Sequence, residues 1–336
     1  IACGNTMVIK AASPTPMTSN RIAALYKEAG FPDGVLNVIT TSRNEAEILL
    51  SHPAIRGVSF VGSTEVAKHI YATAASHGKR VQALGEAKNH ALVLNDAPIA
   101  QTAAAVMNSA FGCAGERCMA LPVLVVQEEI AEPLLAELKR QIQGKKVGAA
   151  YDKETDLGPV VTAKHKAFIL DKIEKGLEEG ATIALDGREV KVDGYADGFY
   201  IGHTILDHVT TDMAVGEEEI FGPVLSIKRV KDFEEGLAVM NANPFANGSV
   251  IFTQSGYYAR EFAKRTDGGM VGINVGIPVP VGIFPFSGHK NSFFGDLHAH
   301  GKDAIRFYTE SKTVTARWFS EEETAHVDSW DGSRTN

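Results

Sequence analysis

Cys118 is the residue of this chain whose surroundings best suit nucleophilic chemistry. It follows the segment FGCAGER, in which Gly115 permits a tight loop, so the thiol is expected to be exposed and close to backbone N–H donors. Arg117 beside it either stabilises a thiolate and lowers its pKa or points away toward solvent or a substrate anion. The alternative for a lone cysteine is a small buried hydrophobe. The buried hydrophobe is the commoner case for a lone cysteine, and Arg117 shifts the balance toward a nucleophile, so both interpretations stay open here.

Gly62 and Ser63 lie between a predicted strand and a predicted helix. Free N–H groups and the Ser63 hydroxyl at such a turn can hold a phosphate at the helix N-terminus. The sequence is not GxGxxG, and a plain turn with a helix cap is the alternative. Lys10 ends a short predicted strand, where its amine either reaches a ribose or phosphate or is solvated.

Two further groups have residue types that can do chemistry. Glu218 and Glu219 precede IFGPV and are either catalytic acids or a solvated acidic pair. His298 and His300 form an HxH pair without further ligands at metal spacing, so we predict no metal site.

The first third of the chain must supply the elements that position the turn at Gly62. It alternates β-branched apolar runs with amphipathic windows, which is typical of parallel strands with crossover helices. Strands are predicted at 6–9, 35–39 and 57–61, and helical windows at 22–29, 45–50 and 64–75. These elements form two consecutive αβ units.

The cysteine loop lies at the start of a second αβ region, which we expect to end near Phe286. Strand-like VQAL and HALVL flank the turn GEAKN, and a predicted helix at 99–110 leads into FGCAGERC. A strand in LPVLVV follows, and then helices at 131–143, 166–179 and 232–241. The sequence therefore predicts an α/β protein with the chemistry at the junction of two regions.

Length, charge and cysteine content narrow the class of protein. At 336 residues the chain should hold about two domains. Its net charge of −8 gives no general attraction to nucleic acid or membranes, so small-molecule substrates are expected. Three cysteines, an odd number, favour a reducing compartment, here the cytoplasm. The apolar run 275–286 is short, contains three prolines and is predicted to be a loop.

Seven segments occur in the order in which aldehyde dehydrogenases have them, and this resemblance covers residues 1–317. They are GNTMVIK, EAGFPDGVLNVIT, FVGSTE, FGCAGERC, EEEIFGPV, GMVGINV and FSGHK. RCMA, AKNH, INVGIPVPV and FYTESKTVTARWF are most similar to the branch of methylmalonate-semialdehyde and malonate-semialdehyde dehydrogenases, which transfers an acyl group to coenzyme A. Because the family starts well upstream of GNTMVIK, we expect an N-terminal portion to be missing.

The resemblance implies roles for the cysteine loop. Cys118 matches the thiol that attacks the aldehyde, passes hydride to the nicotinamide as a thiohemiacetal and becomes a thioester. Its own N–H would be one oxyanion donor. The family's second donor, an asparagine, belongs to an N-terminal segment outside this chain. Arg117 matches an arginine that binds the substrate carboxylate, and a planar fork suits that role. A substrate β-carboxylate also explains decarboxylation at the thioester stage.

The resemblance also implies a nicotinamide cofactor. Gly62 and Ser63 match the turn at the pyrophosphate, and Lys10 matches the lysine at the adenosine ribose. Glu219 and Phe221 match the residues that hold the nicotinamide ribose and ring.

Ser13 replaces a glutamate that many family members use to bind the adenosine ribose hydroxyls. Serine repels a 2′-phosphate less, so NAD is favoured by the branch while NADP stays possible. Glu116 stands where glutamine is commoner. An acid two residues from the thiol is expected to raise the pKa of Cys118, and Arg117 to offset it.

One departure bears on the fate of the thioester. Hydrolytic members carry a general-base glutamate at the start of ELGGK, where this chain has Leu84 in LGEAK. Leucine cannot activate water, so the thioester should survive until coenzyme A takes the acyl group. Glu86, two positions along, substitutes as the base only if the loop is rearranged.

Together these features predict an aldehyde dehydrogenase-like α/β fold. We expect 1–85 to be part of a Rossmann-type cofactor domain, 86–290 a catalytic domain, 291–308 a return to the cofactor domain, and 309–336 an oligomerisation strand with a polar tail. The expected partners are a small semialdehyde and coenzyme A in a homodimer or homotetramer. The rival hypotheses are a hydrolytic aldehyde dehydrogenase and a truncated, non-catalytic assembly partner.

Overall fold

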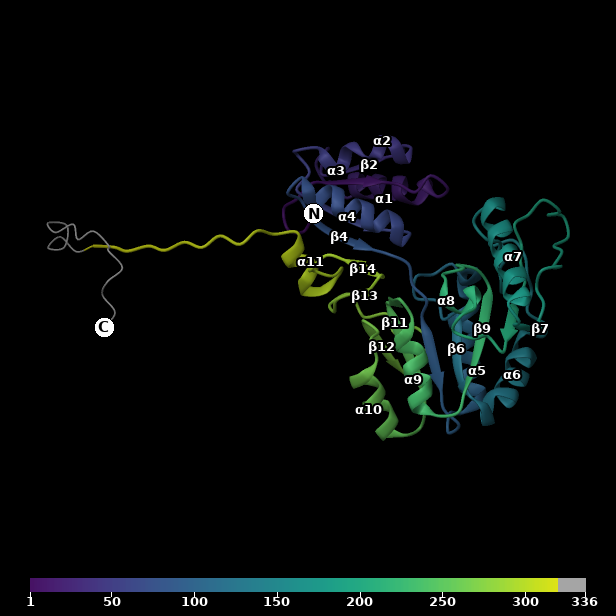
Figure 1. Ribbon diagram of the computed structural model, residues 1–336. Helices are drawn as coiled ribbons and strands as arrows, with labels where there is room; N and C mark the ends of the chain where they lie inside the picture. The colour runs from purple at the N-terminus through teal and green to yellow at the C-terminus, as the bar shows by residue number, and fades with distance from the viewer. Residues whose placement is uncertain (320–336) are drawn as a thin grey trace, which may run out of the picture.

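In the computed structural model, which describes residues 1–319, the chain forms two α/β lobes (Figure 1). The first 84 residues and a late segment make the upper lobe, and the larger lobe surrounds a seven-stranded sheet. The polar tail predicted at the C-terminus begins beyond the described residues.

The upper lobe contains the two predicted αβ units. In the first unit β1 and β2 are parallel neighbours joined by α1, and in the second β3 and β4 are parallel neighbours joined by α4. The elements are β1 (Met7–Lys10), α1 (Pro16–Glu28), β2 (Leu36–Ile39), α2 (Arg43–Ala46), α3 (Ile48–Ser51), β3 (Gly57–Val61), α4 (Thr64–Ser76) and β4 (Arg80–Leu84). Parallel strands with a crossover helix place the start of α4 just beyond the end of β3.

The larger lobe is built on a sheet of order β12-β11-β5-β6-β9-β8-β7, in which only β7 runs antiparallel to its neighbour. Its strands are β5 (His90–Val93), β6 (Val123–Gln127), β7 (Thr182–Leu185), β8 (Thr204–Asp207), β9 (Val224–Val230), β11 (Gly248–Phe252) and β12 (Met270–Ile273). The parallel strands are nearly continuous apolar runs because both faces of the sheet are covered.

Helices cover both faces of this sheet (Figure 1). Alternate strand residues pack against α5 and α6 on one face, as Ala91 does, and against α9 and α10 on the other, as Leu92 does. The helices are α5 (Ile99–Val106), α6 (Glu128–Ile142), α7 (Ala163–Glu178), α8 (Ala214–Glu217), α9 (Phe233–Ala242) and α10 (Gly256–Arg265). Because successive side chains of a strand point to opposite faces of the sheet, the core forms two layers, one on each face.

After β12 the chain returns to the upper lobe. The short strands β10 (Phe245–Ala246) and β13 (His289–Lys290) pair antiparallel, and β14 (Phe293–Phe294) pairs antiparallel with β4. Helix α11 (Gly301–Phe307) follows. The Arg80 guanidinium donates to the backbone carbonyls of Arg306 and Phe307 at 2.7 and 2.8 Å, which holds the end of α11 against β4.

The oligomerisation strand expected after α11, at the start of 309–336, stays a prediction. The segment after α11 contains no helix or strand as far as residue 319, and Val314 and Trp318 are exposed. Alternating residues favour an extended backbone, but a strand also needs a neighbouring strand to bond with, and a single chain offers none here. The apolar run 275–286 forms a loop without helix or strand, as predicted. Within residues 1–319, no helix has the length and apolar character needed to cross a bilayer.

Candidate active site

An irregular turn after α5 places Cys118. The predicted helix ends at Val106 rather than 110, and Met107–Phe111 continue as a π-helical turn. A tight turn follows in which Cys113, Ala114 and Gly115 have positive φ. Such local departures from α geometry are concentrated at functional sites, because they re-aim the chain that follows. The π-helical turn that replaces the predicted end of the helix therefore directs the cysteine loop back over the sheet.

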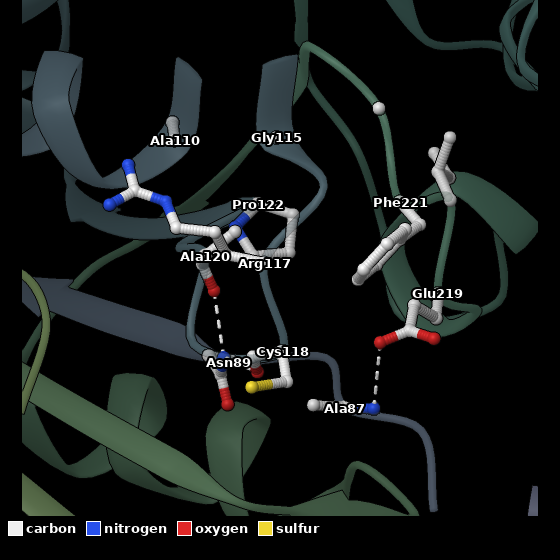
Figure 2. Close-up of a pocket in the computed structure, with 12 residues that line it drawn as sticks. Ala87, Asn89, Ala110, Gly115, Arg117, Cys118, Ala120, Pro122, Glu219 and Phe221 are labelled. Carbon is white, nitrogen blue, oxygen red and sulfur yellow. Dashed lines mark hydrogen bonds between the residues drawn. The ribbon is translucent and has the colours of Figure 1, made fainter. Parts of the chain in front are cut away.

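Four of the predicted site residues line one pocket at the end of the large sheet (Figure 2). They are Arg117, Cys118, Glu219 and Phe221. Cys118 is solvent-accessible, and its thiol and the Glu219 carboxylate both enter the pocket around Ala87 (Figure 2). Residues separated by about one hundred positions thus line the same pocket.

Close backbone contact between Gly115 and Gly222 brings these two segments together. A Cβ at Gly115 would lie 2.1 Å from the Gly222 carbonyl oxygen, and Gly115 has φ +72°. A side chain there would therefore separate the cysteine loop from the loop that carries Glu219 and Phe221.

We predict that Gly115→Ala loses more than about 2 kcal/mol of unfolding free energy, because a backbone carbonyl cannot move aside cheaply. It should also slow alkylation of Cys118 by iodoacetamide. Urea denaturation and alkylation rates measure both effects. Gly144→Ala is the matched control: φ is +85° there too, but nothing lies within 4 Å of the new Cβ. Equal losses in the two variants would show that the contact with Gly222 is unimportant.

The pKa of the Cys118 thiol is raised, first by desolvation in the pocket and then by the charge of Glu219. The backbone N–H groups of Cys118 and Met119 lower the pKa and oppose this rise. The acid predicted to raise it was Glu116, and that prediction was wrong. The Glu116 carboxylate accepts a hydrogen bond from Val161 N at 3.1 Å and lies 3.6 Å from His165 Nε2. The charge that raises the pKa of the Cys118 thiol is that of Glu219, which is far away in sequence.

Arg117 points away from Cys118, which is the second of the two alternatives the sequence left open (Figure 2). Its Nε donates to the carbonyl of Gly112 at 3.1 Å, and its Nη2 donates to the carbonyl of Asn108. Arg117 is not among the causes of the Cys118 pKa shift, so the offset predicted from it is absent. The guanidinium instead ties the cysteine loop to the π-helical turn.

Glu219 is the second titratable group in the pocket. Its carboxylate accepts a hydrogen bond from Ala87 N at 3.0 Å, drawn in Figure 2. Desolvation is the main cause that raises its pKa from 4.5 to about 7. The charge of Glu86 also raises this pKa, whereas the Ala87 bond and the charge of Lys88 lower it. Glu219 is thus poised between its two protonation states near neutral pH.

The raised pKa of Glu219 predicts that the stability of the protein depends on pH. Because the pKa of Glu219 is higher in the folded state, its stabilising contribution is complete below pH 4.5 and is lost as the pH rises through about 7. Glu219→Gln should remove that loss, so the variant gains stability over the wild type between acidic and mildly alkaline pH. Urea denaturation at a series of pH values measures the difference. The neighbouring Glu218→Gln, whose parent carboxylate is 53% exposed and pairs with Lys172, is the matched surface control, and a flat difference for Glu219→Gln would contradict the shift.

The predicted phosphate turn lies at the start of α4. Gly62 follows β3, and Ser63 precedes Thr64 without bonding its side chain to the helix. The N–H of Thr64 donates to the Glu86 carboxylate at 3.3 Å, and the Thr64 hydroxyl accepts from Glu86 N at 3.0 Å. Glu86 is therefore engaged with α4, which does not support it as a replacement base. Leu84 is buried in a cluster with Met119, next to Cys118.

Lys10 and Ser13 lie apart from the pocket, in the upper lobe. Lys10 ends β1 and Ser13 is exposed on the connection to α1. No contact between either residue and the pocket is present among residues 1–319. They share the upper lobe with the turn at Gly62, whereas Cys118 and Glu219 belong to the larger lobe.

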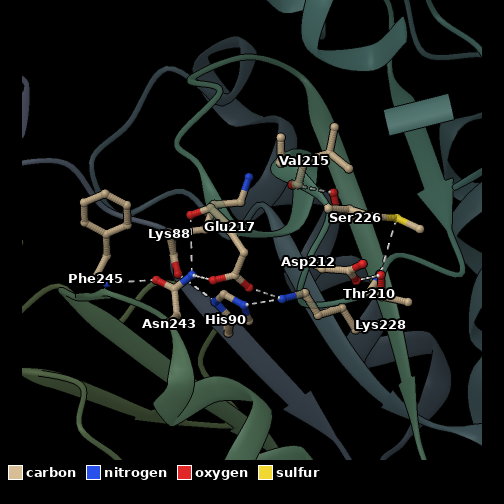
Figure 3. Close-up of polar contacts among 12 residues, drawn as sticks. Lys88, His90, Thr210, Asp212, Val215, Glu217, Ser226, Lys228, Asn243 and Phe245 are labelled. Atoms are coloured by element: carbon tan, nitrogen blue, oxygen red, sulfur yellow. Dashed lines mark hydrogen bonds and ion pairs between the residues drawn. The ribbon is translucent and has the colours of Figure 1, made fainter. Parts of the chain in front are cut away.

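Behind the pocket lies a buried polar network that the sequence did not predict (Figure 3). The Lys228 ammonium donates to Glu217 at 2.7 Å and to His90 Nε2 at 3.5 Å. His90 Nδ1 lies 2.7 Å from the Lys88 carbonyl, which can only accept, so the proton is on Nδ1 and Nε2 is the acceptor. Asn243 Nδ2 also donates to Glu217, at 2.9 Å. The only signal in the sequence is polar residues within the strand-like HALVL and SIKRV.

Lys88 adjoins this network with an amine that has no hydrogen-bond partner among the described residues. Burial, and secondarily the charge of Lys228, lower its pKa from 10.5 to about 7. The same burial lowers the pKa of His90 well below its usual value. Within residues 1–319, no three His, Cys, Asp or Glu side chains are placed to share a metal ion.

Comparisons with known proteins show which family the chain belongs to. Residues 1–314 match the model of the aldehyde dehydrogenase family. Malonate-semialdehyde dehydrogenase 1 of Oceanobacillus iheyensis is 49% identical over 319 residues, which cover 95% of this chain and 65% of that protein. The chain therefore spans just under two thirds of that relative.

Two solved structures are similar in sequence and fold. The methylmalonate-semialdehyde dehydrogenase of Oceanimonas doudoroffii has a TM-score of 0.93 at 45% identity, covering 96% of this chain and 66% of that one. An NAD complex of a Sinorhizobium meliloti 1021 protein assigned as a methylmalonate-semialdehyde dehydrogenase also has a TM-score of 0.93, at 44% identity and 95% and 65% coverage. With the family model matched along nearly the whole chain and the fold shared, this chain belongs to the aldehyde dehydrogenase family.

Proposed function

We propose that the protein oxidises malonate semialdehyde or its methyl homologue with NAD, with loss of CO2 and transfer of the acyl group to coenzyme A. The observation that carries the proposal is the pocket that an accessible Cys118 and Glu219 both line. The resemblance places Leu84 where hydrolytic members have their base. The named relatives support this choice of substrate.

The chain offers suitable groups for a dinucleotide. The N-cap residue Ser63 of the 13-residue helix α4 makes no side-chain bond to the helix, and Glu86 engages only the Thr64 N–H. The other backbone N–H groups and the helix dipole favour a pyrophosphate. The Glu219 carboxylate suits ribose hydroxyls, and the half-exposed Phe221 ring suits the nicotinamide. Lys10 and Ser13 would bind the adenosine ribose. When bound, NAD supplies the hydride acceptor that turns a thiohemiacetal into a thioester.

Cys118 carries the covalent chemistry. Its thiolate bonds to the aldehyde carbon, and its own N–H faces the oxygen on which negative charge develops. In the thioester, breaking the bond to the β-carboxylate releases CO2 and leaves an electron pair that the thioester carbonyl stabilises as an enolate. A proton then converts the enolate to the acyl group. For malonate semialdehyde, the thiol of coenzyme A takes an acetyl group and frees Cys118.

Arg117 is proposed to anchor the substrate carboxylate. A guanidinium has five N–H donors, and the backbone carbonyls of Asn108 and Gly112 engage its Nε and Nη2. The bonds that hold the guanidinium also fix its direction, while Nη1 is free of protein bonds among the described residues and can face an anion. This arrangement supports recognition of a substrate carboxylate rather than activation of the thiol.

The test of the proposal follows NADH absorbance with malonate semialdehyde and NAD, with and without coenzyme A. Turnover that requires coenzyme A supports acyl transfer, because Leu84 cannot activate water. Turnover independent of coenzyme A would favour the hydrolytic alternative. A folded protein whose thermal unfolding does not respond to NAD would favour the non-catalytic alternative.

We also propose a homodimer or homotetramer in the cytoplasm. The exposed apolar side chains of Val314 and Trp318, on an extended segment, support strand pairing with a second copy. Cys3, Cys113 and Cys118 are all free thiols, which supports a reducing compartment. Light scattering of the purified protein measures the oligomeric state.

A further inference from the structure

The backbone carbonyl of Cys118 accepts hydrogen bonds from two asparagine side chains. Asn89 Nδ2 donates to it at 3.0 Å and Asn247 Nδ2 at 3.2 Å. The two residues lie 29 and 129 positions from Cys118 and directly precede the neighbouring parallel strands β5 and β11. Both side chains are buried, with 4% and 6% exposure, so these amides are shielded from water.

Further bonds fix the orientation of both amides. Asn89 Oδ1 accepts from Gly248 N at 2.8 Å, and Asn89 Nδ2 also donates to the Ala120 carbonyl at 2.7 Å (Figure 2). Asn247 Nδ2 also contacts the Met119 sulfur at 3.2 Å. Because Asn89 Oδ1 has a backbone donor of its own, the opposite flip of this amide would bring two donors together. The pair is therefore a preorganised donor set around the peptide after Cys118.

That peptide joins the two asparagines to the thiol. The Cys118 carbonyl and the Met119 N–H belong to the same planar amide, in which nitrogen and oxygen share electrons. Donors on the carbonyl oxygen withdraw electron density and make the N–H a stronger donor. The Met119 N–H is one of the groups that lower the pKa of the Cys118 thiol, against the effects of desolvation and Glu219.

We propose that Asn89 and Asn247 are positioning residues that aim and polarise the peptide between Cys118 and Met119, so that its N–H stabilises the Cys118 thiolate. This inference rests on the proposed function only in taking Cys118 as the nucleophile. Arg117, the nearest cation in sequence, points away, so neutral dipoles rather than a charge activate the thiol.

The test measures alkylation of Cys118 by iodoacetamide as a function of pH. Cys3→Ser and Cys113→Ser in the background leave Cys118 as the only thiol. Asn89→Leu and Asn247→Leu keep the side-chain size and remove the donor. We expect each to move the midpoint of the alkylation profile to higher pH and to slow alkylation at neutral pH by about 3- to 10-fold. Asn247→Ala removes the same donor without a branched side chain if the leucine variant does not fold.

Asn241→Leu is the matched control, because its amide also donates to a backbone carbonyl, that of Arg265 at 2.8 Å, but does not line the pocket. Its midpoint should equal that of the parent. A purely structural role of Asn89 and Asn247 would change the rate equally at all pH values, and an unchanged midpoint in folded variants would overturn the proposal. The assay uses no aldehyde, NAD or coenzyme A, so its outcome is independent of whether the proposed reaction occurs.

Discussion

Replacing Cys118 with serine is expected to abolish NAD-dependent oxidation, with a fall in kcat of roughly 10,000-fold or more. The serine hydroxyl keeps the approximate size of the thiol but has a far higher pKa, so it is a much weaker nucleophile at neutral pH. Steady-state NADH formation measures the loss, and circular dichroism establishes that the variant is folded.

Cys113→Ser is the matched control for this prediction. Cys113 is also an exposed free thiol on the same loop, and its φ of +54° is equally strained for serine and cysteine. Its activity should stay within about threefold of the wild type, as for an ordinary surface substitution. Substantial activity in Cys118→Ser, or an equal loss in Cys113→Ser, would show that Cys118 is not the nucleophile.

The largest predicted effect on stability comes from Glu217→Ala, with a loss of about 3 kcal/mol of unfolding free energy. The Glu217 carboxylate accepts from the Lys228 ammonium, whose side chain is only 3% exposed, and from Asn243 (Figure 3). Alanine would leave Lys228 buried without its counter-ion. The cost of an unpaired buried charge exceeds what a surface pair contributes.

Glu218→Ala provides the comparison on the adjacent residue. Its carboxylate pairs with Lys172 and is 53% exposed, so its removal should cost less than about 1 kcal/mol. Urea denaturation near neutral pH measures both variants. Similar losses for the two would mean that the network around Lys228 is not a buried ion pair in solution.

The fold could be predicted from the sequence where periodicity is strong. The αβ alternation of the first 84 residues and the apolar strands β5, β6 and β9 follow from local pattern, because each strand is short and apolar and each helix amphipathic. The end of α5 could not be predicted. Its small residues suit a longer helix, and the π-helical turn is held by contacts made later in the chain, such as those of Arg117 with Asn108 and Gly112.

The sequence predicted which segments form the candidate site, but it did not predict the contacts that their side chains make. The motifs indicated that Cys118 and Glu219 belong together, and the structure has them in one pocket. Their neighbours in sequence were misleading, since Glu116 bonds to Val161 N and Arg117 to backbone carbonyls. Side-chain direction depends on the backbone of a tight turn, which residue types alone do not specify.

The buried network and the asparagine pair show a second limit of prediction from the sequence. Asn89 and Asn247 are 158 residues apart, and their shared carbonyl becomes visible only once β5 and β11 are neighbours. A polar residue in a strand pattern indicates an edge or a surface as readily as a buried partner. The pairing of β5 with β11 in the folded chain brings the two asparagines together, and no local sequence pattern specifies that pairing.

The measurement that tests the central claim most directly is the fate of the acyl group on Cys118. The protein is mixed with malonate semialdehyde and NAD without coenzyme A, and samples are analysed by mass spectrometry before and after coenzyme A is added. We predict an acetyl group on the peptide that contains Cys118, stable in buffer because Leu84 cannot activate water, and removed when coenzyme A is added. Loss of the acyl group at the same rate with and without coenzyme A, or its absence from Cys118, would contradict the account.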